Sequence, residues 1–571
     1  MQRLATTCEA IAGTTKKLLK IGIVAEYLKL RTTDAAAVSA VFLSGQAFPV
    51  WEETTLQVGG RSLWQIVAEL SGKGEDELTA AYRCHGDLGS VAGEVLPERA
   101  GQGLEVLEVG RSFRQIAVAR GPATKASIVR DLISRATPLE AKYVVKIMTG
   151  DLRIGLKESL VEEAIARAYG GTLAEVQRAN MLLGDLGETV RLAAEGTLAK
   201  AEMRMFHPFG FMLASPIESA EEGLSYFAEA AVEDKYDGIR AQAHVSAGEV
   251  KFFSRTRDDI TESFPELPDA LAGLSQDAIL DGEILAWDYL AGRARPFSVL
   301  QQRLGRKKVS DKMLREIPVA FVAFDVLYAG GELVLDRPLR DRARILDDLL
   351  AGKNRSHHGG TESQRKLSKT GTQGKLVFGN EEEETVTAHM IRAPVFCASS
   401  PDELEGLFAA AQDRGNEGLM IKDLNSPYTP GKRGKSWLKM KRELATLDVV
   451  VTAVEYGHGK RVGVLSDYTF AVWDGGRLVN IGKAYSGLTD VEIAEMTQWF
   501  LDHTVDDQGF RRAVEPKIVL EVAFNNMMQS DRHESGYALR FPRIVRLRPD
   551  KSAEEADTID RVREIFDQQT A

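Results

Sequence analysis

The chain has 571 residues, of which 44% are hydrophobic and 27% are charged. This is the balance of an ordinary soluble protein with enough apolar side chains for real cores, so wholesale disorder is excluded. At roughly 100–200 residues per domain, the length predicts about three domains. No run approaches the roughly 18–20 uncharged apolar residues of a membrane span, and the N-terminal sequence lacks the apolar core of a signal peptide.

Cysteine and charge patterns narrow the protein class further. Cys8, Cys84 and Cys397 are scattered and odd in number, which excludes a disulfide framework and a zinc ribbon and predicts a cytoplasmic protein. The formal net charge of -11 argues against a nucleic-acid partner only if the basic residues are spread evenly. They cluster in Gly431–Glu443 and Leu539–Lys551, so binding of phosphate by local positive charge stays open.

Residues 1–205 are predicted to be helical. Apolar residues recur three and four positions apart in 17–30 and 157–170, as the buried face of a helix requires. The segment His207–Ser219, which holds two prolines, is predicted to be a loop that leads into the next domain.

Residues 206–444 alternate short β-rich runs with helices, which predicts a mixed α/β domain. Strands are expected at 231–237, 239–246, 250–255, 278–288 and 319–328, and a helix at 341–350. The polar insert 352–390 is predicted to be a solvated loop. Two adjacent histidines within it, His357 and His358, favour a loop surface over a metal site.

Residues 445–571 carry the pattern of a small β-barrel. Strand-like runs cover 447–456, 468–485 and 517–525. Asp474–Gly475 lies between apolar runs and predicts a hairpin, because tight primed turns need residues that tolerate positive φ.

The strongest local motif is EDKYDGIR, from Glu233 to Arg240. A lysine follows a β-like run and is surrounded by carboxylates, an aromatic residue, a glycine and an arginine. Alone, this pattern fits an exposed strand end about as well as it fits a nucleophilic lysine. A nucleophilic amine must be unprotonated, which requires nearby cations, a metal or partial desolvation.

An ordered set of further motifs follows this lysine. Their key members are Arg255 in FSRTRDD, Asp281 and Glu283 in LDGEILAWD, Phe324 in FVAFDVLY, Glu417 and Lys422 in GNEGLMIKD, and Lys439 and Lys441 in SWLKMKRE. Each one has an ordinary structural explanation, such as a core aromatic residue or a solvated strand edge. In this order they are jointly incompatible with chance.

The ordered set resembles the motifs of ATP-dependent DNA ligases, which belong to the covalent nucleotidyltransferase superfamily. Residues Lys146–Gly170 also resemble the DNA-binding domain of the larger, replicative-type ligases. The resemblance covers nearly the whole chain except the insert. It implies an all-α DNA-binding domain at 1–205, a mixed α/β adenylation (nucleotidyltransferase, ATP-grasp-like) domain at 206–444 and an OB-fold barrel at 445–571.

The resemblance also implies residue roles. Lys235 would attack the α-phosphate of ATP and form lysyl-AMP, Glu233 would contact the adenine edge, and Phe324 would stack on the base. The ribose and the phosphates would be lined by Arg240, Arg255, Glu283, Arg433 and Lys439, with Lys441 a weaker candidate. Magnesium would be held by Glu283 and Glu417, because it prefers hard oxygen ligands. Asp237 receives no closer assignment.

Two regions carry less of the resemblance. The basic run Leu539–Lys551 implies a motif that closes over ATP and helps to expel pyrophosphate, but the sequence does not decide which arginine makes the contact. In SRTRDD, many relatives have asparagine and glycine where this chain has Thr256 and Arg257. The resemblance therefore assigns no role to these two residues.

The implied reaction is nick sealing in three steps: self-adenylation, transfer of AMP to the 5′-phosphate of a nick, and attack by the 3′-hydroxyl. The expected partner is nicked duplex DNA, gripped by phosphate contacts with little reading of bases. Gly150–Leu156 either presents Arg153 and backbone amides to phosphate or forms an interhelical turn. A monomer is expected, and the sequence does not decide whether a sliding clamp binds.

Three alternative functions are weighed against this one. An RNA ligase or a capping guanylyltransferase shares the lysine chemistry, but RNA ligases usually lack the large helical N-terminal region. An NAD-dependent ligase would need a four-cysteine zinc finger, which three scattered cysteines cannot supply. A catalytically silent scaffold is disfavoured because the nucleophile, the glutamates and the phosphate-binding lysines are all present.

Overall fold

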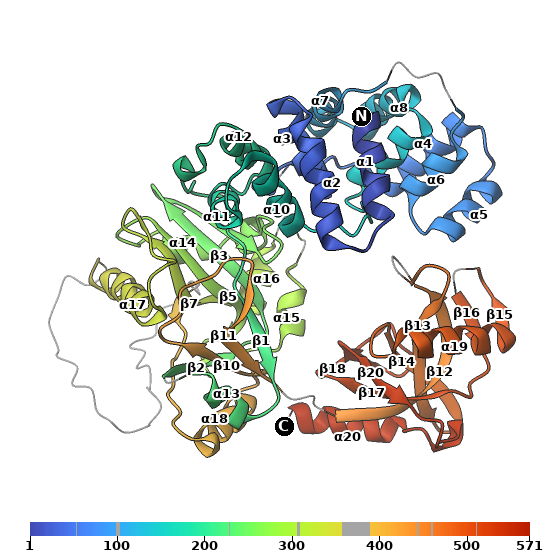
Figure 1. The fold of residues 1–571 in the computed structure, drawn as a ribbon. Coiled ribbons are helices and arrows are strands. Elements are labelled where there is room, and N and C mark those ends of the chain that lie inside the picture. The colour runs from blue at the N-terminus through green and yellow to red at the C-terminus, as the bar shows by residue number, and fades with distance from the viewer. Residues whose placement is uncertain are drawn as a thin grey trace. The chain divides into compact units, whose positions relative to one another are not determined.

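The computed structural model describes residues 1–52, 54–98, 103–227, 229–304, 306, 309–356, 389–441, 445–457, 461–509 and 511–570. The chain forms two compact units (Figure 1). One comprises Met1–Ala201 and Glu443–Ala571, and the other comprises Glu202–Arg442. Within the first unit, the helical segment and the C-terminal segment each have a hydrophobic core of their own. The predicted division at 205 and 444 into three domains stays a prediction.

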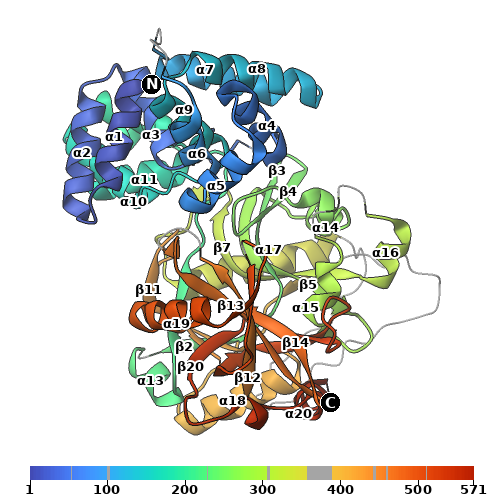
Figure 2. The same ribbon diagram turned by 90° about the vertical axis from the view of Figure 1, so that its right-hand side faces the viewer.

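The helical segment confirms the prediction of an all-α fold, and its described residues contain no strand (Figure 2). The predicted helices at 17–30 and 157–170 are α2 and α10. Its helices are α1 (Gln2–Ala12), α2 (Lys17–Lys29), α3 (Thr33–Leu43), α4 (Gly60–Ser71), α5 (Glu75–His85), α6 (Leu88–Val95), α7 (Val106–Val118), α8 (Pro122–Arg135), α9 (Pro138–Met148), α10 (Glu158–Tyr169), α11 (Leu173–Leu183) and α12 (Leu186–Ala194). Among the described residues of the whole chain, no helix is both long and apolar enough to span a membrane.

Helices α6 and α9 approach each other unusually closely at Gly89. A Cβ there would lie 2.4 Å from Cγ of Lys146 and 2.6 Å from the carbonyl oxygen of Lys142. Asp87 caps the N-terminus of α6 by accepting from the backbone N–H of Ser90 at 2.8 Å. The same carboxylate pairs with Lys146 at 2.8 Å, and both side chains are less than 9% exposed. A buried charge is stable only when it is paired in this way.

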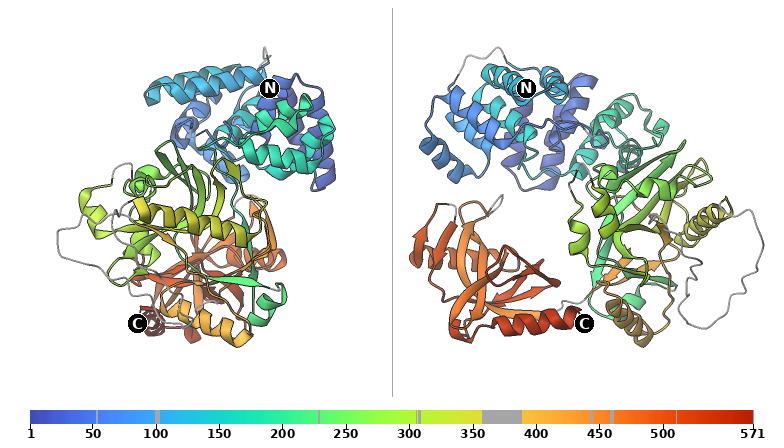
Figure 3. Two further views of the ribbon diagram at one scale, coloured as in Figure 1. Left: turned by 90° about the vertical axis from the view of Figure 1, so that its left-hand side faces the viewer. Right: turned by 180° about the vertical axis from the view of Figure 1, so that it is seen from behind.

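The second unit contains two sheets covered by helices (Figure 3). The larger sheet has the order β4-β3-β5-β7-β8, with β6 on β5 and β9 on β7, and the smaller has the order β1-β11-β10-β2. The strands are β1 (Leu213–Ile217), β2 (Ala230–Lys235), β3 (Ile239–Ser246), β4 (Glu249–Ser254), β5 (Ala278–Asp288), β6 (Arg293–Ala294), β7 (Val319–Ala329), β8 (Glu332–Leu333), β9 (His389–Arg392), β10 (Gly418–Asp423) and β11 (Arg433–Met440). The helices are α13 (Ala220–Ser225), α14 (Leu267–Leu271), α15 (Phe297–Gln301), α16 (Asp311–Glu316), α17 (Leu339–Ser356) and α18 (Pro401–Asp413).

The five strands predicted in this region are confirmed as β2, β3, β4, β5 and β7. The predicted loop at His207–Ser219 is partly wrong, because β1 lies within it and pairs in parallel with β11. Its Pro216 is tolerated because β1 is an edge strand, where a missing N–H breaks no ladder on the open side. The predicted helix at 341–350 is α17 and continues to Ser356. Most of the insert, including His357 and His358, lies outside the described residues.

The C-terminal segment is rich in β-structure, as predicted. Its long strand β12 pairs with β13 along one edge and with β17 and then β16 along the other, so the sheet curls. The predicted hairpin at Asp474 joins β13 to β14 through Gly475 and Gly476, both at positive φ. The elements are β12 (Ala445–Tyr456), β13 (Leu465–Asp474), β14 (Arg477–Ala484), α19 (Asp490–Asp502), β15 (Thr504–Asp507), β16 (Arg511–Val514), β17 (Val519–Phe524), β18 (Asn526–Gln529), β19 (Tyr537–Arg540), β20 (Arg543–Leu547) and α20 (Ile559–Thr570).

A buried histidine of the larger sheet forms a hydrogen bond with the segment that precedes β1. Nδ1 of His244, on β3, accepts from the backbone N–H of Phe206 at 3.1 Å. The side chain of Gln242 exchanges two hydrogen bonds of 2.9 Å with the backbone of Phe209. His244 is fully buried, and this burial, with the positive charge of His207 adding to it, lowers the pKa of His244 to about 3. A protonated ring would lose the acceptor at Nδ1.

The low pKa of His244 predicts a loss of stability in mild acid. Below the ordinary histidine pKa of 6.5, the unfolded chain binds a proton that the folded chain does not. As the pH falls below 6.5, the free energy of unfolding should therefore decrease with a slope that approaches about 1.4 kcal/mol per pH unit. Hydrogen exchange of β3 peptides in the full chain, corrected for intrinsic exchange rates, measures this slope. His244→Gln should be less stable at pH 7.5 but show a shallower slope, and an equal slope would contradict the assignment.

Candidate active site

Lys235 is positioned by the pairing of two strands that are far apart in sequence. It is the last residue of β2 and lies opposite Gly418 of β10 in antiparallel register. The backbone N–H of Glu417 donates to the carbonyl oxygen of Lys235 at 2.9 Å, and Nζ of Lys235 contacts Oε2 of Glu417. The two side chains are 22% and 20% exposed. The lysine therefore lies in a partly solvated site with a carboxylate on its amine.

Gly418 makes this arrangement possible. Its φ of 145° lies outside the range that other residues adopt readily, and a Cβ at this position would lie 2.2 Å from the carbonyl oxygen of Met440. Only glycine lets β10 start beside Glu417 while it also pairs with β11.

Glu283 is the second carboxylate near Lys235. It lies on β5, opposite Arg240 of β3, and is half-buried. Burial raises the pKa of Glu283 to about 8; the positive charges of Lys235 and Arg240 oppose this rise, while the negative charges of Asp281 and Asp237 add to it. A further cation near this carboxyl would favour its ionised form.

Gly238 follows the predicted nucleophile and packs against β5. A Cβ there would lie 2.5 Å from the carbonyl oxygen of Ile284 and 2.8 Å from Cγ of Glu283. Close packing against Glu283 and Ile284 of β5 thus explains the glycine at this position.

Arg240 is bound within the protein. Nε and Nη2 donate to the two carboxylate oxygens of Asp281 at 3.1 and 2.7 Å, and Nη1 donates to the carbonyl oxygen of Met212 at 2.7 Å. Its guanidinium carbon lies 5.5 Å from the ring centre of Phe324. Tyr428 donates to Asp281 at 2.6 Å and so completes the buried cluster. Arg240 is predicted to reach the nucleotide, and most of its donors serve this cluster.

Glu233 and Phe324 lie together with two residues that the sequence does not single out as site residues. Lys422 donates to Oε2 of Glu233 at 2.5 Å. The lysine nitrogen lies 4.4 Å from the ring centres of both Phe324 and Trp437. Lys422 belongs to the GNEGLMIKD motif and Trp437 to the SWLKMKRE motif, but neither motif assigns these two residues a role.

Positive charge gathers on β11, beside Lys235. Lys439 is half-buried, and burial together with the positive charges of Lys441, Lys235 and Arg433 lowers the pKa of Lys439. Arg433, at the start of the strand, is exposed and donates to the carbonyl oxygen of Ala214 at 3.0 Å. The structure thus brings the predicted phosphate-binding cations to the same region as the predicted nucleophile.

Comparison with protein families accounts for most of the chain. A family model described as "ATP dependent DNA ligase domain" matches residues 211–441, one described as "DNA ligase N terminus" matches 1–166, and one described as "ATP dependent DNA ligase C terminal region" matches 461–551. A protein from Koribacter versatilis named "Probable DNA ligase" is 60% identical over 99% of this chain and 96% of its own length.

The chain belongs to the ATP-dependent DNA ligase family.

This family seals nicks in DNA through an enzyme-bound adenylate and uses ATP, which confirms the function predicted from the motifs. A "DNA ligase" from Methanopyrus kandleri is 34% identical over 99% of this chain and 98% of its own length. A solved structure titled "Pmar-Lig_PreS3" has a TM-score of 0.59 at 16% identity, covering 95% of this chain and 99% of that one. This last likeness concerns the fold alone.

Arg255 lies apart from the buried part of the ligase site. It is exposed in the turn after β4, and its role stays a prediction. Two residues later, Arg257 has a φ of 72°, and its N–H donates to the carbonyl oxygen of Ser254 at 2.8 Å. The turn therefore requires the left-handed conformation, which favours glycine, and this chain adopts it with an arginine.

The basic run of the C-terminal segment is largely paired within that segment. Arg548 and Lys551 both donate to Asp448 of β12, at 2.8 and 2.6 Å, and Arg546 donates to Glu521 of β17 at 2.7 Å. The predicted contact of this motif with pyrophosphate stays a prediction, and it would require these ion pairs to be exchanged for phosphate.

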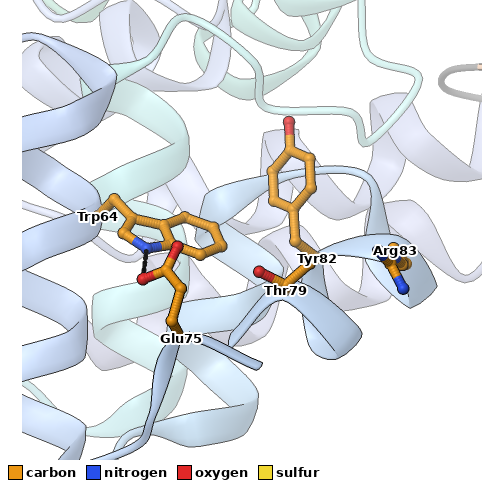
Figure 4. A pocket seen from close by; sticks show the side chains of 5 residues that line it. All are labelled: Trp64, Glu75, Thr79, Tyr82 and Arg83. Atoms are coloured by element: carbon orange, nitrogen blue, oxygen red, sulfur yellow. Dashed lines mark hydrogen bonds between the residues drawn. The ribbon is translucent and has the colours of Figure 1, made fainter. Parts of the chain in front are cut away.

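A pocket of about 340 Å³ lies in the helical segment, lined by residues of α4 and α5 (Figure 4). The ring centres of Trp64 and Tyr82 are 5.8 Å apart there. A neighbouring cavity shares both rings and reaches Arg153, which donates to Asp151 at 2.7 Å and to the carbonyl oxygen of Gly86 at 2.8 Å. Arg153 is thus held by its neighbours in the turn between α9 and α10, and a contact of this turn with DNA phosphate stays a prediction.

The packing under Glu283 predicts a severe effect of Gly238→Ala. The added methyl group overlaps backbone of β5, so it must displace Glu283 or the start of β3, and we expect a loss of about 1–3 kcal/mol in the free energy of unfolding. The rate of self-adenylation with labelled ATP should fall with it. The matched control is Gly406→Ala in α18, where a Cβ meets nothing within 4 Å; it should be slightly more stable and fully active. A wild-type rate in Gly238→Ala would contradict this account.

Proposed function

We propose that Lys235 is the residue that carries AMP in this ligase. The proposal is supported by the position of the amine at the end of β2, in contact with Glu417 and within the electrostatic reach of Glu283 and Lys439. A nucleotidyl transfer needs this combination, because a lysine must lose a proton while negative charge builds on phosphorus.

In the first step, Nζ of Lys235 attacks the α-phosphorus of ATP. The bond from that phosphorus to its bridging oxygen breaks, and pyrophosphate leaves with the electron pair. Glu417 contacts Nζ and is the carboxylate placed to accept the amine proton. Lys439 and Arg433 would balance the charge on the phosphate oxygens.

The nucleotide would be oriented by residues on β2, β3 and β7 and in the turn after β4. Phe324 would stack on adenine and Glu233 would accept a hydrogen bond from its edge. Arg240 would face the ribose and the α-phosphate with the donors that Asp281 and Met212 leave, and Arg255 would reach the nucleotide from its exposed turn.

Glu283 and Glu417 fit a magnesium ion. Both supply hard oxygen donors beside Lys235, and a raised carboxyl pKa at Glu283 is relieved by a nearby cation. Among the residues that the structure describes, no cluster of three or more His, Cys, Asp or Glu could hold a metal, so ATP and water would complete its coordination. When bound, the ion would neutralise phosphate charge and orient the leaving group.

The second and third steps use the same cations. AMP passes from Lys235 to the 5′-phosphate of a nick, and the 3′-hydroxyl then attacks that phosphate and releases AMP. All three steps are displacements at phosphorus, so one set of positive groups can serve each in turn. The substrate we propose is nicked duplex DNA, held by backbone phosphates.

The nucleophile can be tested with α-labelled ATP and magnesium. The wild-type protein should become labelled, and the label should map to the peptide that contains Lys235. Lys235→Ala should lose the label completely, because no other amine would occupy its position, while its binding of nicked DNA should stay within about twofold of wild type.

Lys435→Ala is the matched control for this experiment. Lys435 lies on β11 of the same unit, and its side-chain nitrogen is 4.1 Å from the ring centre of Tyr226. The Lys435→Ala protein should be labelled as strongly as the wild type. A labelled Lys235→Ala protein would show that the nucleophile is another residue.

DNA binding should depend steeply on salt despite the acidic composition of the chain. Contacts with phosphate release counterions, so affinity for nicked duplex should fall by about 10³-fold or more between 50 and 200 mM salt if six or more phosphates are contacted. Fluorescence anisotropy with a labelled nicked duplex measures this. An affinity that stays flat over this range would contradict a phosphate-dominated interface.

A further inference from the structure

Lys422 is a fully buried lysine that the reaction described above does not use. Its side chain is 1% exposed and its partner Glu233 is 5% exposed, and the two are 2.5 Å apart. Phe324 and Trp437 lie on the same nitrogen, each with its ring centre 4.4 Å away. Lys422 therefore contacts both residues to which adenine recognition is assigned, Glu233 and Phe324.

Keeping the amine of such a buried lysine charged costs free energy. Burial lowers the pKa of Lys422, and the negative charges of Glu233 and Asp325 oppose that shift. The pair is further stabilised by the faces of the two aromatic rings, which attract a cation. A buried lysine does not contribute to solubility. Its contact with Glu233 is therefore the feature of Lys422 that calls for an explanation.

The two purine bases differ in the group that a carboxylate at this edge would meet. Adenine presents the N6 amine, which donates, and guanine presents the O6 carbonyl, which accepts. An ionised carboxylate only accepts hydrogen bonds, whereas a protonated one can also donate. The ionisation state of Glu233 thus decides whether it favours adenine or tolerates guanine.

We propose that Lys422 is a positioning residue that holds Glu233 in place as an ionised, acceptor-only group and thereby makes this ligase select ATP over GTP. The inference rests on the proposed function, because it assumes that Glu233 faces the base edge. Without Lys422, the carboxylate of Glu233, buried between β2 and β10, loses this ion pair, and the loss of a cation beside a buried carboxylate favours its neutral, protonated form. It then offers an O–H to guanine O6.

Lys422→Met tests the proposal, because methionine retains a flexible side chain of similar length and removes the charge. Self-adenylation of the full chain is measured with α-labelled ATP and, in parallel, with α-labelled GTP, each over a range of concentrations. We expect KM for ATP to rise and the ratio of kcat/KM for ATP to that for GTP to fall by at least about tenfold. Lys435→Met, which removes an exposed lysine stacked on Tyr226, should leave the ratio unchanged.

The ratio separates recognition from folding. Both nucleotides are tested on the same preparation, so a loss of folded protein lowers both rates and cancels in the ratio. A merely structural role for Lys422 would therefore leave the preference for ATP intact, and that result would overturn the inference. If the wild-type protein takes no label from ATP at all, the proposed function fails instead.

If Lys422→Met does not fold, Glu233→Gln provides a second test of the proposal. Glutamine has the shape of glutamate and carries an amide N–H that can donate to guanine O6, so the preference for ATP should fall as it does in Lys422→Met. The double variant, which contains neither buried charge, should show the same ratio as the single variants rather than the product of their effects. An unchanged ratio in Glu233→Gln, or multiplicative effects in the double variant, would overturn the coupling of these residues.

Discussion

The antiparallel pairing of β2 with β10 is the constraint on which the candidate active site depends. It joins segments 182 residues apart. Lys235 of β2 meets Glu417, the residue before β10, at one end, and Glu233 of β2 meets Lys422 of β10 further along. Because the side chains of a strand alternate in direction, a slip of one residue would move Lys422 to the face opposite Glu233. Gly418 secures the register, since its missing Cβ lets β10 pair with β11 on its other edge.

A second constraint lies in the larger sheet, where two buried carboxylates stand opposite each other. Asp281 of β5 and Asp325 of β7 are cross-strand partners and both are fully buried. Adjacent like charges of this kind would repel strongly, and each carboxylate is neutralised by its own arginine. Arg240 binds Asp281 in bidentate fashion, and Arg342 binds Asp325 at 2.8 and 2.9 Å. Such pairs add little net stability but leave a costly charge behind if one member is lost. Arg240, which is predicted to face ATP, thus also neutralises the buried carboxylate of Asp281.

The sequence predicts the strands of this unit well because their apolar residues are continuous, as in β5 and β7. The motif around Lys235 alone fits an exposed strand end equally well, and only the ordered set of later motifs favours a nucleophile there. The sequence does not reveal β1, because Pro208 and Pro216 indicate a loop; a strand forms there because β11 offers an edge. The motifs contain Lys422 and Trp437 but assign neither of them a role. From sequence alone, a lysine in an apolar strand is most simply explained as an edge residue. The partner of Lys422 is a buried carboxylate 189 positions away, and only the structure shows that the two are in contact.

The contact between α6 and α9 restricts how the helical segment can vary. At Gly89 the obstacle to a side chain includes the main chain of α9, through the carbonyl oxygen of Lys142, as well as the flexible stem of Lys146. Trimming Lys146 would therefore not make room for a larger residue at 89, and it would deprive the buried Asp87 of its partner. The glycine, the aspartate and the lysine thus form a coupled set, in which a substitution at one position changes the packing or the charge balance at another.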